Sequence, residues 1–193
     1  MPILGAEQDI HPANLLDSAA GADCAICDDA EKKWWCVYTL SRREKDFMRK
    51  LLAMNIAFYG PVIPKRYRSP NGRLRTSYVP LFPNYVFMLA SEEERQKSLT
   101  SNCIATCQEI TGREQLVDDL RRLKSIVGAG VALTPEAKLE EGNRVRVRTG
   151  PFAGYEGTVV RRQGKTRLLL AIKYLEQGVS MEMDEGLLEP LDS

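Results

Sequence analysis

Apolar residues recur along the first part of the chain with two different periods. Residues 34–40, WWCVYTL, are β-branched and aromatic, which is typical of a strand. Phe47, Leu51 and Met54 then follow at helical spacing. This change of period predicts a buried strand followed by an amphipathic helix over about 42–54.

The start of this predicted helix carries a polar signature. Ser41 and Glu44 have the spacing of a capping box, in which the two side chains satisfy each other's backbone N–H groups. Arg42, Arg43 and Lys45 surround the same point. The sequence therefore predicts a capped helix with a basic N-terminus.

The following residues predict a basic hairpin and then a mixture of strands and helices. Two extended segments, 56–67 and 73–79, flank a Ser-Pro-Asn-Gly turn, in which Pro fixes φ and Asn-Gly tolerates positive φ. The basic residues around the tip of this hairpin are Lys65, Arg66, Arg68, Arg73 and Arg75. Later elements are a strand at 84–89, a charged helix at about 91–99, a weak strand at 103–110 and a helix marked by Leu116, Leu120, Leu123 and Val127. The order predicts an α+β domain, an antiparallel sheet with packed helices.

The C-terminal residues have a different character. Arg and Val alternate at 144–148, and glycine-containing turns then separate short apolar runs. This spacing predicts a small β-barrel of about five strands over 142–193. Pro151 and the neighbouring glycines also disfavour a helix. Residues 129–141 are predicted to be a linker, 34–128 a folded domain, and 1–33 an acidic, disordered tail.

Charge is distributed unevenly, although the formal net charge is only +1. Residues 1–33 hold seven acidic residues and two lysines, whereas residues 34–90 hold ten basic and two acidic residues. The second segment also holds 11 of the 14 aromatic residues. Such a segment is typical of a surface that binds a polyanion. The alternative is that the aromatic residues form a core and the arginines its hydrated face.

Composition excludes several classes of protein. With 44% apolar and 27% charged residues the chain is globular, and no apolar run is long enough to span a membrane. The first residues lack the pattern of a secretory signal, so a cytoplasmic protein is expected. The one histidine, His11, lies in the predicted tail, and no phosphate-binding loop is present. We therefore expect no enzyme activity and no cofactor.

Five cysteines leave a metal or redox alternative open. Cys24 and Cys27 form a CxxC, and Cys103 and Cys107 lie four positions apart. These four thiols are a conceivable zinc site. The spacing is not that of two matched zinc knuckles, and no predicted strand precedes Cys24 as a thioredoxin-like motif requires.

Two stretches resemble known domains. Residues 150–159, GPFAGYEGTV, are similar to a KOW domain. Residues 34–38 and 80–87, the latter PLFPNYVF, resemble the N-terminal domain of the NusG family. The combined resemblance covers residues 33–191. Asn84, where many members have Gly, favours the specialised RfaH-like branch.

The resemblance implies a factor for transcription elongation and antitermination. In this family the N-terminal domain binds the clamp helices of RNA polymerase and suppresses pausing, without covalent chemistry. The positions that match the polymerase-binding residues are Tyr38, Phe82, Tyr85 and Phe87. Because Tyr85 and Phe87 are two apart on a strand, they share one face, which is either an interface or the core.

Contacts with nucleic acid and with a further partner are implied as well. The matching positions for the non-template DNA strand are Ser41, Arg42, Arg43 and Lys45. In the KOW domain, the positions for Rho or a small-subunit ribosomal protein are Tyr155, Tyr174 and Leu175, with core packing as the alternative. A monomer without membrane contact is expected. The alternative function is a KOW-type RNA-binding module of the ribosome.

Overall fold

The chain forms two compact units in the computed structural model, Met1–Arg113 and Glu114–Ser193. The structure describes residues 7–17, 31–70, 72–136, 142–162, 165–172, 175 and 177–191. Each unit has its own antiparallel sheet. In these residues no helix is long and apolar enough to cross a membrane.

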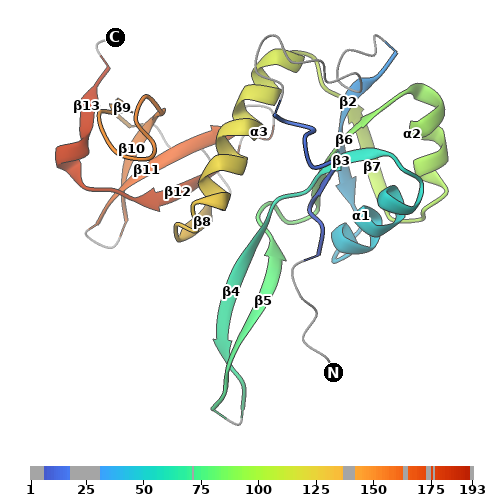
Figure 1. Cartoon of the computed structure of the whole chain (residues 1–193), viewed down its shortest axis with the longest axis horizontal. Helices are drawn as coiled ribbons and strands as arrows, with labels where there is room; N and C mark the ends of the chain where they lie inside the picture. Colours follow the sequence, from blue (N-terminus) through green and yellow to red (C-terminus); the bar gives the residue numbers. More distant parts are fainter. Residues whose placement is uncertain are drawn as a thin grey trace. The chain divides into compact units, whose positions relative to one another are not determined.

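The described part of the first unit consists of a five-stranded sheet, two helices and a separate two-stranded arm (Figure 1). The sheet has the order β1-β3-β6-β2-β7. Its strands are β1 Ile10–His11, β2 Lys33–Thr39, β3 Ala57–Tyr59, β6 Tyr85–Ala90 and β7 Ile104–Glu109. The helices are α1 Glu44–Ala53 and α2 Glu92–Leu99. The arm pairs β4 Val62–Arg68 with β5 Leu74–Pro80 and extends away from the sheet.

One face of this sheet packs against α1. Trp35 on β2 and Met88 on β6 are paired across the strands and buried, as are Val37 and Val86. Phe47 of α1 is fully buried in the same cluster. Burying a side chain of this size contributes about 1.5–3 kcal/mol relative to leaving it exposed. The predicted strand and helix of residues 34–54 are therefore confirmed.

The predicted capping box at the start of α1 is wrong. Arg43 is the residue that precedes the helix, and no side chain caps it. Arg42 has a φ of +60°, in the left-handed region. The Glu44 carboxylate turns inward, and its Oε1 accepts the Asn84 backbone N–H at 2.7 Å. The N–H of Asn84, 40 positions away, thus takes the place of the Ser41 N–H as the partner of Glu44, because a buried carboxylate requires a hydrogen-bond donor.

Helix α2 is capped by the signature that α1 lacks. The Ser91 hydroxyl accepts the Glu94 N–H at 3.2 Å, and Glu94 Oε2 accepts the Ser91 N–H at 2.9 Å. Arg95 lies with its guanidinium carbon 5.0 Å from the centre of a Trp35 ring. This cation–π contact contributes to the packing of α2 on the sheet.

The N-terminal segment differs from the expected disordered tail. Strand β1 pairs antiparallel with β3, and the Gly60 N–H donates to the Asp9 carbonyl at 2.8 Å. Leu15 and Leu16 are both 0% exposed. Without β1, strand β3 would be an unpaired sheet edge, so the segment covers backbone groups that need partners.

The second unit contains helix α3, Arg113–Gly128, and in its described residues a six-stranded sheet. The sheet has the order β13-β9-β10-β11-β12-β8, and no pairing of described residues closes β13 onto β8. Its strands are β8 Leu133–Glu136, β9 Arg144–Val147, β10 Glu156–Arg162, β11 Lys165–Ile172, β12 Gln177–Glu182 and β13 Leu188–Pro190, with the short helix η2 Glu185–Leu187 before the last. The β character predicted for 142–190 is thus confirmed, whereas a closed five-stranded barrel is not seen. Strand β8 lies in the predicted linker, where its pairing with β12 outweighs a weak local pattern.

Candidate functional site

Two solvent-accessible tyrosines lie at one end of a face of the first sheet. Tyr38 on β2 lies opposite Tyr85 on β6, and their ring centres are 5.1 Å apart in an edge-to-face arrangement. Tyr38 is 38% exposed and Tyr85 half-buried. The next pair on this face, Cys36 and Phe87, is buried. The face therefore changes from buried to accessible along its length, and the two tyrosine rings mark the accessible end.

A tight loop before β6 positions these rings. Phe82 is 2% exposed and its carbonyl accepts the Tyr85 N–H at 3.2 Å. Asn84 has a φ of +70°, a conformation that Gly and Asn adopt most readily. Its carbonyl accepts the Thr39 N–H at 2.7 Å, and its side-chain amide donates to the Tyr38 hydroxyl at 3.4 Å. The loop thus joins β2 and β6 at the tyrosine pair.

Burial acts on two titratable groups of this face. Burial raises the pKa of Tyr85, with smaller contributions from Cys36 and Tyr38. Burial also raises the pKa of the Cys36 thiol to about 12. The tyrosine pair offers apolar surface and hydroxyl hydrogen bonds, which suits recognition.

The structure brings the four predicted polymerase-binding residues together around one loop and one strand pair. Tyr38 and Tyr85 reach the surface, whereas Phe82 and Phe87 are buried and support them from within. Their role in binding stays a prediction.

A basic hollow of about 590 Å³ lies at the start of α1. It is lined by Arg42, Arg43, Glu44, Lys45, Asp46, Arg49 and Pro80. Three of the four predicted nucleic-acid residues therefore line one hollow, and the exposed Ser41 directly precedes them. Arg49, one turn further along the helix, was not predicted from the sequence; its spacing of four from Lys45 is the signal that would have found it.

Some cations of this hollow form ion pairs with nearby carboxylates, and one does not among the described residues. The Arg43 guanidinium is 3.0 Å from Asp46, and Arg49 is 2.9 Å from Glu7. Lys45 is 3.8 Å from the same Glu7. Arg42 makes no ion pair within the described part of the chain.

The arm continues the positive surface beyond the hollow. All five of its predicted basic residues are exposed, and none forms an ion pair within the residues that the structure describes. Tyr67 and Leu74 near the tip are 46% and 66% exposed. The sequence placed this hairpin correctly because its turn chemistry is local.

The second unit holds the residues predicted for a further partner. Tyr155 is half-buried, with its ring centre 5.9 Å from that of the buried Phe152. Leu175 is 8% exposed, as the core-packing alternative requires. Tyr174 lies outside the described residues.

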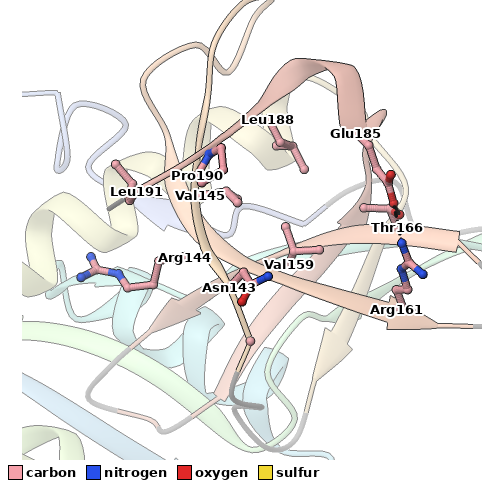
Figure 2. Close-up of a pocket in the computed structure, with 11 residues that line it drawn as sticks. Asn143, Arg144, Val145, Val159, Arg161, Thr166, Glu185, Leu188, Pro190 and Leu191 are labelled. Atoms are coloured by element: carbon pink, nitrogen blue, oxygen red, sulfur yellow. Dashed lines mark hydrogen bonds and ion pairs between the residues drawn. The ribbon is translucent and has the colours of Figure 1, made fainter. Parts of the chain in front are cut away.

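A hollow of about 900 Å³ in this unit contains none of the predicted partner residues (Figure 2). Val145, Val159 and Leu188 give it an apolar part, and Arg144 lies at the opposite side from Arg161 in the view. Arg161 donates to Glu185 at 3.2 Å. The sequence pattern did not predict the hollow, because its lining comes from several segments spread over residues 142–191.

The structure describes only Cys103 and Cys107 of the four thiols in the zinc alternative. The described residues contain no group of three or more His, Cys, Asp or Glu side chains that could hold a metal ion. Cys103 is fully buried, and its thiol donates to Asp46 at 3.4 Å. Cys24 and Cys27 lie outside the described part of the chain.

Comparison with known proteins identifies both units. The family profile described as transcription termination factor nusG matches residues 32–130, and the KOW motif matches residues 141–170. The transcription termination/antitermination protein NusG of Pseudomonas aeruginosa is 27% identical over 177 residues, 82% of this chain and 98% of that protein. The crystal structure of the MjSpt4:Spt5 complex in conformation B is similar over 83% of this chain and 97% of that chain, with 14% identity and a TM-score of 0.26. That TM-score is too low for a comparison of folds.

The NusG profile covers just over half of the chain, including the tyrosine pair, the basic hollow and the arm. Members of the family are transcription factors rather than enzymes. This chain therefore belongs to the NusG family of transcription factors, with a KOW motif in its second unit.

Proposed function

We propose that this chain is an elongation and antitermination factor that binds the clamp helices of RNA polymerase and suppresses pausing. The observation that carries the proposal is the Tyr38–Tyr85 pair at the accessible end of an otherwise buried aromatic face. Tyrosines are enriched at protein interfaces because one ring offers apolar area and a hydrogen-bonding tip. The pair thus offers the clamp helices an aromatic contact surface with hydrogen-bonding edges.

Preorganisation supports the same assignment. The edge-to-face packing and the bond from Asn84 restrict both tyrosine rings before any partner arrives. Rings that are already ordered lose less entropy on binding, which favours affinity. Asn84 at the positive-φ position is also the residue on which the assignment to the RfaH-like branch rests.

The basic hollow is proposed to hold the non-template DNA strand during elongation. Arg42, Arg43 and Lys45 stand at the N-terminus of α1, where the helix dipole and free N–H groups also favour anions. The exposed Ser41 hydroxyl adds a hydrogen-bonding group. The arm supplies further cations that track a phosphate backbone.

The KOW unit is proposed to act as a small SH3-like barrel that recruits Rho or a small-subunit ribosomal protein. Among the predicted contacts that the structure describes, Tyr155 is half-buried. Tyr174 and the buried Leu175 complete the predicted patch. A ribosomal KOW module is the less favoured function, because the aromatic first unit has no role in it.

Polymerase binding by full-length variants tests the main proposal. Tyr85→Ala removes an interface anchor and is expected to cost about 2 kcal/mol, a weakening of about 30-fold. Tyr67→Ala removes an exposed tyrosine from the arm and serves as the matched control. Equal affinities of the folded Tyr85→Ala variant and wild type would place the polymerase site elsewhere.

Salt dependence tests the contact with DNA. Affinity for single-stranded DNA should fall with salt, and replacing Arg42 and Arg43 with Ala should flatten the slope of log affinity against log salt by up to about 1.4, or 0.7 per phosphate. An unchanged slope in the double variant would move the DNA surface away from α1.

A further inference from the structure

An acidic side chain from the N-terminal segment occupies the basic hollow's edge. Arg49 Nε and Nη2 donate to the two oxygens of Glu7 at 2.9 and 3.2 Å. Lys45 Nζ lies 3.8 Å from the same carboxylate. Glu7 is only 18% exposed, whereas the Arg49 side chain is 56% exposed. The two cations of α1 thus hold one anion in a forked geometry.

The N-terminal segment is anchored where it delivers this carboxylate. Two residues after Glu7, the Asp9 carbonyl accepts the Gly60 N–H at 2.8 Å, and β1 follows on the edge of β3. His11 bonds to the Asn55 side chain at 3.0 Å. The buried Leu15 and Leu16 complete the attachment. Glu7 therefore reaches α1 as part of a docked segment.

A carboxylate and a phosphate present similar paired oxygens to an arginine fork. The seated Glu7 carboxylate accordingly shows that the Arg49 fork and Lys45 can hold a doubly accepting anion in this position. We propose that Lys45 and Arg49 form a further phosphate-binding subsite for single-stranded nucleic acid, and that Glu7 fills this subsite in the free protein. The inference rests on the proposed contact between the α1 start and nucleic acid.

The charges around this subsite determine how strongly a nucleic-acid strand binds there. Asp46 lies 3.0 Å from Arg43, 3.3 Å from Lys50 and 3.9 Å from Arg49, so it neutralises part of the same helix face. Arg42 lacks such a pair among the described residues and offers the first phosphate a free cation. A strand bound at Arg42 meets the second subsite only by displacing Glu7. Glu7 thereby reduces affinity without blocking the first contact.

Replacing this one carboxylate tests the inference in the full-length protein. The probe is an oligothymidine of about 16 nucleotides, the upper end of common single-strand site sizes. Glu7→Gln should bind the probe about two- to fivefold more tightly than wild type, as expected for release of a partly exposed ion pair. The slope of log affinity against log salt should steepen by about 0.7 for one added phosphate.

A matched control separates the subsite from net charge. Glu93→Gln makes the same charge change at an exposed acid of α2 that pairs with no described residue. It should leave affinity and slope close to wild type. Equal gains in the Glu7→Gln and Glu93→Gln variants would overturn the inference. A cooperative urea transition of each variant verifies that both remain folded.

A second variant links the effect to Arg49. In an Arg49→Gln background, Glu7→Gln should give less than half of its gain, because the cation that it releases is absent. An undiminished gain would also overturn the inference. Failure of the proposed DNA contact gives a different result: neither wild type nor Glu7→Gln binds the probe in a salt-dependent way. If wild-type binding weakens with salt but Glu7→Gln gives no gain in affinity, the proposed subsite is wrong while the proposed DNA contact stands.

Discussion

Glu44 joins the first turn of α1 to the loop that carries Tyr85, so its replacement tests what holds the tyrosine pair in place. Its Oε1 accepts the Asn84 N–H at 2.7 Å, and the residue is only 7% exposed. Glu44→Ala leaves that half-buried N–H without its acceptor. Water replaces the lost bond poorly at a site of such low exposure.

The expected loss follows from two contributions. A hydrogen bond to a charged group is worth about 1.5–3 kcal/mol. A carboxylate in the first turn of a helix adds about 0.3–1 kcal/mol through the helix dipole. Glu44→Ala should therefore lower the free energy of unfolding by about 2–4 kcal/mol. Glu93→Ala, an exposed acid in the first turn of α2, loses only the smaller contribution and is the matched control.

Tryptophan fluorescence reports this unit selectively. The chain has two tryptophans, Trp34 and Trp35, and both lie buried on β2. A urea titration followed by this signal should show a midpoint for Glu44→Ala that is roughly 1–2 M below that of Glu93→Ala, at an unchanged m-value. Glu44→Gln keeps an acceptor oxygen and should fall between them.

The refuting result is equal destabilisation by Glu44→Ala and Glu93→Ala. The bond to Asn84 would then add nothing beyond the helix dipole. Glu44→Ala could also lower stability without lowering the affinity for polymerase. That result would mean that Glu44 stabilises the fold but is not needed to hold the loop around Tyr85 in place.

Three further predictions concern other parts of the chain. Leu16→Ala should destabilise the first unit by about 2–5 kcal/mol, because Leu16 is fully buried; an unchanged urea midpoint of tryptophan fluorescence would mean that the segment is not docked. Gly154→Ala should cost the second unit about 1–2 kcal/mol through its φ of +83° alone, since an added Cβ meets no atom within 4 Å; faster hydrogen exchange of β9 and β10 would measure this cost. Cys36 should react with iodoacetamide at pH 8.5 only after unfolding. Because burial raises its pKa to about 12, the unfolded chain loses this proton first and stability falls as the pH rises from about 9 to 12, which urea midpoints across that range would show.

Local patterns were enough to predict most elements of the first unit and most strands of the second. The β-branched and aromatic run of β2, the helical spacing of Phe47 and Leu51, and the turn between β4 and β5 each depend on neighbours in the chain. The Arg-Val alternation predicted β9 for the same reason, since a half-buried strand repeats every two residues. Family resemblance added the two domain types, and the family comparison confirmed them.

Contacts between distant segments decided the remaining features. Glu44 left the capping position predicted for it because Asn84, 40 positions away, offers a half-buried N–H. The acidic N-terminal segment docked because β3 presents an open edge, and β8 formed because β12 offers a pairing partner. The periodic pattern of one segment does not show which distant segment it will pair with.

The sites follow the same division. The two-residue spacing of Tyr85 and Phe87 on a strand was enough to predict that they share a face. The sequence of basic residues at 42–45 was enough to predict that the start of α1 is positively charged. Only the tertiary structure decided that Tyr85 reaches the surface while Phe87 is buried, and that Glu7 lies on Arg49, 42 positions away. Burial and ion pairing depend on which segments the completed fold brings together in space, and that information is spread over the whole chain.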